Sequence, residues 1–393
     1  MNPNRLPERP LPKLPMKNTY PAALAAMATL LCMVVVSAAP FDSGSTGAYG
    51  PINVTSNTTL EMPADGIFHC TTIHVPAGLS LRFAPNPLNT PVYLLATGAV
   101  TIVGTLDVSG AINSGGAPGR GGPGGFDGGY GGFGLGDTSK GGDGQGPGGG
   151  RNLARWYGAA YTAAAGFNTN KYGNSLCIPL IGGSGGSGGD GNPGPGGGGG
   201  GGAILVAANV SITVGGRILA NSANGFGGGS GGTVRLVSPL VTGIGSIQAN
   251  PGGGYSGEFS SPGRIRVDCE DRQAFRTLNL QGFSTRGAQL FAFPSAPLPR
   301  LDIVEAAGQS IPFGTGSSVQ IELPAGSATT RTVRVQARHF IGTVPITVVV
   351  IPENSPSTRY DAQIDMASGN PAEVTVEVLI PRSSISRIQT WTR

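Results

Sequence analysis

Three stretches of the chain share one pattern of apolar and polar positions. They are YLLATGAVTIVGTLDVSGAI at 93–112, ILVAANVSITVGGRILANSA at 204–223 and RLVSPLVTGIGSIQANPGG at 235–253. Each has an apolar run, an alternating Val/Ile segment, a glycine, a second short alternating segment and a polar turn. Alternation with a period of two is typical of half-buried strands, and the intervening glycine marks a corner. A unit of about 20 residues that cannot bury its own apolar face must stack on copies of itself. The pattern predicts an all-β chain built on a parallel β-solenoid.

Weaker copies of this pattern extend the predicted solenoid over residues 40–293. IFHCTTIHVPAGLSLRFAP at 67–85 reads as a first rung or an N-terminal cap, and GRIRVDCE at 263–270 and TLNLQGFS at 277–284 read as last rungs. Gly-rich insertions interrupt the rungs at 110–202, 224–232 and 251–263. They recur at one corner of the repeat, so we interpret them as loops of a single architecture. The pattern leaves open whether these loops are ordered.

The composition of the chain changes after the Pro-rich segment 294–300, which we interpret as a hinge. Residues 301–393 contain only six glycines and carry strand-like runs at regular spacing. These runs are LDIVEA, VQIEL, TVRVQARHF, PITVVVIP, YDAQIDM, AEVTVEVLI and IQTWT. Seven short strands separated by turn residues predict a small immunoglobulin-like β-sandwich.

The overall composition removes three classes of protein. Glycine occupies 69 of the 393 positions and proline 32, which excludes a helix bundle because these residues break helices. Collagen is excluded because the glycines come in clumps rather than at every third position. Charged residues make up only 12%, whereas disordered chains combine high charge with low hydrophobicity.

Residues 1–39 resemble a secretory signal. Four basic residues precede the uncharged apolar run AALAAMATLLCMVVVSAA at 22–39, which ends in small side chains. The sequence predicts export to the cell surface or the medium, with removal of residues 1–39. The alternative is an uncleaved anchor, because 18 apolar residues are just long enough to cross a bilayer. Beyond residue 39 we expect no membrane span.

The charge and the cysteine content of the chain do not indicate a particular ligand or reaction. The chain carries 25 basic and 21 acidic residues, and removing 1–39 takes away four basic residues and Glu8, which leaves 21 and 20. No basic surface for nucleic acid is therefore expected. Cys70, Cys177 and Cys269 are not spaced as metal ligands, and their sequence leaves a disulfide pairing open. We expect neither a metal nor another cofactor.

Two groups of residues are the candidate sites. A β-helix enzyme needs neighbouring carboxylates to divide acid and base roles. The acids of successive rungs do not stack, and only Asp268, Glu270 and Asp271 cluster, beside arginines. A charged end that caps the solenoid explains the same cluster. The second group consists of the aromatic residues of the first insertion, whose rings suit contact with sugars or partner proteins: Trp156, Tyr157, Tyr161 and Tyr172. A local core for the insertion is the alternative.

The motif AVTIVGTLDVSG, followed by Gly-rich loops and GGGGGAILVAANVSITVGGRILANSANG, resembles a known type of protein. It is similar to exported, Gly-rich bacterial proteins with a right-handed parallel β-helix, related in shape to filamentous adhesins and pectin-lyase-like enzymes. The C-terminal segment resembles the small sandwich modules that follow such solenoids. The resemblance covers about residues 50–290 and implies a fold and an exported location.

These observations favour an exported structural or adhesive protein without catalytic activity, which presents Gly-rich loops from a solenoid. The first alternative is a polysaccharide-active lyase or hydrolase of the β-helix type. The second is a glycan-binding module that uses the aromatic insertion or the sandwich. The expected partners are extracellular polysaccharide or components of the cell surface.

Overall fold

A computed structural model divides the chain into two compact units, Met1–Pro40 and Phe41–Arg393. It describes residues 40–112, 114–132, 140–152, 157–158, 171–257, 259–271, 277–293, 297, 299–313, 315, 318–352, 357–382 and 385–392. These residues contain strands and one short 3-10 helix, η1 (Met366–Ser368), and no α-helix is found among them. The all-β prediction is therefore confirmed.

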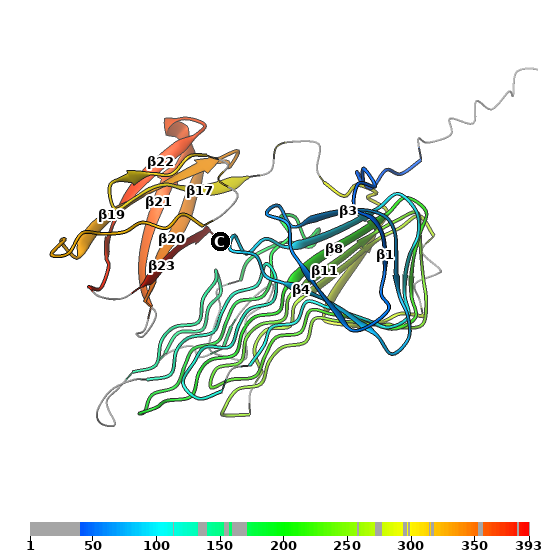
Figure 1. Ribbon diagram of the computed structural model, residues 1–393, viewed down its shortest axis with the longest axis horizontal. Coiled ribbons are helices and arrows are strands. Elements are labelled where there is room, and N and C mark those ends of the chain that lie inside the picture. The colour runs from blue at the N-terminus through cyan, green and yellow to red at the C-terminus, as the bar shows by residue number, and fades with distance from the viewer. Residues whose placement is uncertain are drawn as a thin grey trace, which may run out of the picture. The chain divides into compact units, whose positions relative to one another are not determined.

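Two parallel sheets curl around one another in the first part of the second unit (Figure 1). Their strands are β1 (Gly50–Asn53), β2 (Thr58–Glu61), β3 (Ile67–Val75), β4 (Ser80–Ala84), β5 (Val92–Ala96), β6 (Val100–Ile102), β7 (Thr105–Asp107), β8 (Ala203–Ala208), β9 (Ser211–Val214), β10 (Arg217–Leu219), β11 (Thr233–Val237), β12 (Leu240–Thr242), β13 (Ser246–Gln248), β14 (Arg264–Asp268), β15 (Asn279–Gln281) and β16 (Phe283–Gly287). The larger sheet has the order β12-β9-β6-β3-β5-β8-β11-β14-β16, with β1 beside β3, and the smaller has the order β15-β13-β10-β7-β4-β2. The long strand β3 pairs with β5 through its first half and with β6 through its second half.

Corresponding strands of the three repeats lie beside one another in register. Leu106 of β7 is opposite Ile218 of β10, which is opposite Ile247 of β13. The first strands of the repeats, β5, β8 and β11, are likewise neighbours. Pairing therefore follows the alignment of the sequence pattern, because a shift by one residue would turn every apolar side chain to the other face.

The apolar side chains of both parallel sheets meet in one core. Leu94, Val206 and Leu236 contribute from the larger sheet, and Ile218 and Ile247 from the smaller. A second apolar cluster covers the opposite face of the larger sheet, where Leu95, Leu205 and Val237 contact the chain around Leu180 and Leu290. Strand β8 is therefore buried on both faces, which explains its uninterrupted apolar sequence AILVAA.

The Gly-rich segments form an ordered layer outside the strands (Figure 1). We call residues 108–112, 114–132, 140–150, 182–202, 220–232, 249–257 and 259–263 the Gly-rich layer. The N–H groups of Phe126, Gly129 and Gly132 donate to the carbonyls of Gly183, Gly186 and Gly189, whose own N–H groups donate to Gly201, Gly198 and Pro195. Neighbouring segments are thus joined at every third residue, the period of a polyproline II-type helix. The backbone groups that such loops would leave to water are instead bonded within the layer.

Close approach of these segments explains the glycine content. A methyl group at Gly185 would overlap the carbonyl of Asp127, and one at Gly200 would overlap that of Gly183. The same overlap with a neighbouring backbone recurs at most glycines of the layer. At these positions the packing thus requires residues without a Cβ atom, whatever their backbone angles.

The C-terminal part consists of two antiparallel sheets around a separate core. Their strands are β17 (Arg300–Ala306), β18 (Gln309–Ser310), β19 (Thr330–Arg338), β20 (Thr343–Pro352), β21 (Thr358–Asp365), β22 (Ala372–Leu379) and β23 (Ser386–Thr392). The sheet orders are β18-β17-β19-β22 and β21-β20-β23. Val333 and Val376 from one sheet meet Val348 and Ile364 from the other in the core. This arrangement is sandwich-like.

One predicted strand of this part is wrong. Residues 319–323, VQIEL, form no strand, whereas the unpredicted β18 pairs with the end of β17. Ile321 does pack against the antiparallel core, but its neighbours are mostly exposed. The segment thus contributes an apolar contact to the core without a backbone ladder.

Candidate functional site

The aromatic residues singled out in the first insertion do not form a surface within the described part of the chain. Tyr157 and Tyr172 are buried, whereas Trp156 and Tyr161 lie outside the described residues. The Tyr172 hydroxyl donates to the Gly182 carbonyl at 2.7 Å, and burial raises its pKa. Both tyrosines thus take positions that suit the alternative of a local core. Their binding role stays a prediction.

Three other aromatic residues are presented by the Gly-rich layer, and we call them the aromatic ledge: Phe226, Tyr255 and Phe259. Tyr255 is 82% exposed and Phe259 is 61% exposed. The rings of Phe226 and Tyr255 are nearly parallel, with centroids 5.9 Å apart and planes inclined by 20°. Single exposed aromatic residues are common, but a cluster of them often marks an interaction site.

Backbone bonds fix the ledge to the layer. The Phe226 N–H donates to the Gly196 carbonyl at 3.0 Å, and the Tyr255 N–H donates to the Phe226 carbonyl at 2.9 Å. Beneath them, the Tyr157 hydroxyl hydrogen-bonds the Ser256 hydroxyl. The Tyr157 ring also lies where a side chain at position 254 would be, so that Gly254 is required there. Tyr157 thus supports the segment that carries Tyr255.

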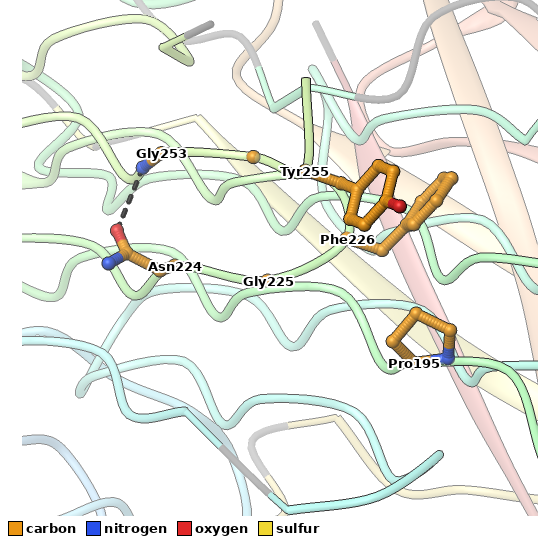
Figure 2. A pocket seen from close by; sticks show the side chains of 7 residues that line it. Pro195, Asn224, Gly225, Phe226, Gly253 and Tyr255 are labelled. Carbon is orange, nitrogen blue, oxygen red and sulfur yellow. Dashed lines mark hydrogen bonds between the residues drawn. The ribbon is translucent and has the colours of Figure 1, made fainter. Parts of the chain in front are cut away.

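The ledge borders a shallow hollow of about 280 Å³ (Figure 2). The hollow is lined by Pro195, Asn224, Gly225, Phe226, Gly253, Gly254 and Tyr255. The Asn224 side-chain oxygen accepts a hydrogen bond from the Gly253 N–H at 2.8 Å. No acidic or basic side chain is part of this lining. The surface offers aromatic faces and neutral polar groups, and this favours an uncharged ligand.

The sequence contained a signal for this ledge that we did not use. Phe226 lies in the Gly-rich corner after one repeat, and Tyr255 and Phe259 lie in the corner after the next. Aromatic residues at the same corner of successive repeats are expected to come together when the repeats stack. The stretch 151–181 within the insertion 110–202 contains more aromatic residues, which is why the sequence favoured it as the contact surface.

The acidic cluster near residue 268 is divided between the interior and the surface. Asp268 is 1% exposed, whereas Glu270 and Asp271 are exposed. Both side-chain oxygens of Asp268 accept from the Arg266 Nε at 3.0 Å, and a third bond joins Asp268 Oδ1 to Arg266 Nη2 at 2.6 Å. Arg235, 2% exposed, lies 3.5 Å from the other oxygen. The three acids are therefore not brought together as a paired acid and base.

Asp268 and Arg235 also form hydrogen bonds with the segment that follows β16. The Gln289 N–H donates to Asp268 at 3.3 Å, and Arg235 donates to the carbonyls of Phe291 and Ala292 at 2.9 and 3.1 Å. Burial lowers the pKa of Arg235, and the charge of Asp268 opposes that shift. This geometry fits the alternative in which the cluster closes one end of the sheet. A catalytic role for these acids stays a prediction.

The described residues offer little for other chemistry. Cys70, Cys177 and Cys269 are free and buried, and burial raises the pKa of Cys70 and that of Cys177 to about 12. In the described part of the chain, no three His, Cys, Asp or Glu residues are grouped to hold a metal ion. Nor does any helix there have the length and apolar character needed to cross a membrane.

Comparison with known proteins gives no relative for this chain. No family model, no curated protein and no solved structure matches it.

Proposed function

We propose that this chain is an exported structural or adhesive protein of the cell surface that acts without catalysis. In this proposal, the curled parallel sheets of residues 40–293 are a right-handed β-solenoid. The segment 294–300 is a hinge, and residues 301–393 are an immunoglobulin-like spacer or cap. The Gly-rich layer is the part presented to partners, which are extracellular polysaccharide or other components of the cell surface.

The observation that carries the proposal is the cross-bonding of the Gly-rich layer. A segment bonded to two neighbours at every third residue has little conformational freedom left to lose on binding. The layer holds exposed aromatic rings on a rigid support, which is what a surface-binding protein requires. A chain that needed glycine only for flexible loops would not need these backbone contacts.

The acidic cluster gives less support to polysaccharide cleavage. An acid catalyst must reach its substrate, whereas Asp268 is buried and bonded to two arginines. Glu270 and Asp271 are exposed, but the neighbouring acid Asp268 is already paired with Arg266 and is not available as their catalytic partner. The non-catalytic function is therefore the better supported of the two.

Attachment and turnover measured on the same materials test this proposal. Beads coated with the full chain are applied to cellulose, mannan, chitin and pectin, and the release of reducing ends and of unsaturated uronates is followed with and without calcium. We expect the beads to attach to at least one material without product release. Product release from any material that is lost in Glu270→Gln would overturn the proposal, and so would failure to attach to every material.

The double variant Gly185→Ala and Gly200→Ala tests the part played by the layer. Each added methyl group overlaps a neighbouring backbone, so the layer should lose its packing. Attachment should then disappear. Attachment that persists unchanged would show that another surface holds the protein.

A further inference from the structure

We propose that the aromatic ledge and its hollow bind one uncharged pyranose ring of a glycan. This inference deepens the proposed function and rests on it. It depends on four features of the site: the exposed ring face, the free polar groups, the neutral lining and the size of the hollow.

The first feature is the arrangement of the rings. The Phe226 ring lies nearly parallel to the Tyr255 ring, with centroids 5.9 Å apart, so that the two rings stand side by side (Figure 2). A pyranose ring has a face of C–H groups that packs on an aromatic face, while its hydroxyl groups point outward to polar partners. With 82% of Tyr255 exposed, its outer face is accessible to such a ring.

The second feature is the presence of unused hydrogen-bonding groups among the residues that line the hollow. The Asn224 oxygen is bonded to the Gly253 N–H, and the NH₂ group of the amide points away from Gly253 and from the two rings in this view (Figure 2). Within the described residues, neither that NH₂ group nor the Tyr255 hydroxyl has a partner in the protein. Both are available to the hydroxyls of a sugar, which accept and donate hydrogen bonds.

The third feature is the absence of charge in the lining. The hollow is formed by glycines, one proline, one amide and two aromatic residues. A phosphate or a uronate would find no basic side chain there to offset the loss of its hydration. A neutral hexose meets no such cost, so we expect neutral oligosaccharides to bind in preference to acidic ones.

The fourth feature is the size of the hollow. About 280 Å³ lies just below the range of about 300–1,000 Å³ for small-molecule sites and suits a single sugar ring. A stable protein partner would need about 800 Å² of its own surface in contact, far more than this hollow offers. A glycan can instead bind tightly through multivalency, because many weakly bound sugar rings act together when many copies of the protein are displayed.

The inference is tested by titrating the full chain with defined oligosaccharides. Cellotetraose, mannotetraose and maltotetraose serve as neutral probes and tetragalacturonate as the acidic probe, with saturation-transfer NMR and calorimetry as readouts. We expect at least one neutral probe to bind, with saturation transferred from aromatic protons to the C–H face of one sugar ring. Preference for tetragalacturonate, or no binding of any neutral probe, would overturn the inference.

Three variants locate the site. Tyr255→Ala should weaken neutral binding by about tenfold, because the stacking surface is lost. Asn224→Asp keeps an oxygen acceptor for Gly253 but removes the NH₂ donor, and it should weaken binding by a smaller factor. Tyr49→Ala is the matched control, because Tyr49 is also an exposed tyrosine (51%) but packs edge-on against Phe68 instead of belonging to the ledge. Equal affinity of Tyr255→Ala and the unchanged protein would overturn the inference.

These outcomes are separable from those of the proposed function. If beads attach equally well with Tyr255→Ala but fail with the double glycine variant, the adhesive function stands and the sugar site is wrong. If neutral oligosaccharides bind at Tyr255 but beads attach to nothing, the site stands and adhesion is wrong. If the chain binds a protein and none of the glycans, the sugar site is likewise wrong.

Discussion

Gly200 shows why many glycines of the Gly-rich layer tolerate no side chain. Its Cα faces the Gly183 carbonyl, so that a methyl group must displace the backbone of the neighbouring segment. We expect Gly200→Ala to lower the free energy of unfolding by about 1–3 kcal/mol, as overpacking does in a close-packed interior. Gly215→Ala is the control, since its nearest contact would lie at 3.9 Å, an ordinary separation. Urea denaturation of both variants measures the difference, and equal midpoints would contradict the packing argument.

Asp268 presents the opposite situation, in which removal of a charge is harmful. Arg235 and Arg266 are buried beside it, and Asp268→Asn would leave two cations without their counter-charge. Loss of one partner from a buried charge cluster costs about 3–5 kcal/mol. Glu270→Gln should change stability by less than about 0.5 kcal/mol, because Glu270 is exposed. Comparable thermal unfolding of the two variants would argue against a structural role for Asp268.

Residue patterns predicted burial better than they predicted contact surfaces. The alternating positions such as Leu106 and Ile218 are in the core, as a period of two requires. Tyr157 is buried although the Gly-rich insertion that carries it was interpreted as a loop. The reason is that the layer packs its own interior, and this interior is created by contacts between distant glycines that no local pattern records.

At the scale of elements, the stacked strands of the repeat depend on one another. Ile218 of β10 lies between Leu106 and Ile247 and is fully buried. We expect Ile218→Ala to destabilise the protein by about 2–5 kcal/mol, through lost burial and the cavity left behind. Its neighbour Arg217 is exposed, so Arg217→Ala should be nearly neutral. If both variants unfold at the same denaturant concentration, the strand is not held by its buried face.

The parallel strands were accessible from the sequence because their repeats carry the same pattern. Their register follows from pairing like with like, as Leu106, Ile218 and Ile247 illustrate. The strand expected at 319–323 failed because an alternating pattern cannot show whether a backbone partner is present. For the same reason the ledge was missed, since Phe226 and Tyr255 become neighbours only through the stacking of two Gly-rich corners.

For the molecule as a whole, buried thiol and phenol groups are expected to make the free energy of unfolding fall at alkaline pH. Burial raises the pKa of Cys70 and of Cys177 to about 12, and that of Tyr93 also to about 12, above the values of the unfolded chain. Stability from these groups is fully present below their unfolded pKa. It falls as pH rises toward the folded values, because the unfolded chain releases its protons first. Each thiol contributes a loss of up to about 1.4 kcal/mol per pH unit in this window.

Urea midpoints measured from pH 8 to pH 11 test this dependence. We expect a constant midpoint near pH 8 and a decline above about pH 9, the ordinary range of a thiol. The variant Cys70→Ala should start from a lower stability and decline less steeply, because one buried thiol is missing. A decline of unchanged slope would mean that Cys70 is not among the groups responsible.

The expected export of the chain is a prediction for the whole molecule as well. We propose that residues 1–39 direct export and are then removed, so the exported protein should have the mass of residues 40–393. Leu30→Arg with Leu31→Arg interrupts the apolar run and should stop export, because two charges in a short apolar segment prevent its insertion. Asn18→Gln lies outside the run and should have no effect. Mass spectrometry of the medium and of the membrane fraction gives the answer. A protein of full mass in the membrane fraction would identify residues 22–39 as an anchor, and the ledge would then act on a tethered molecule.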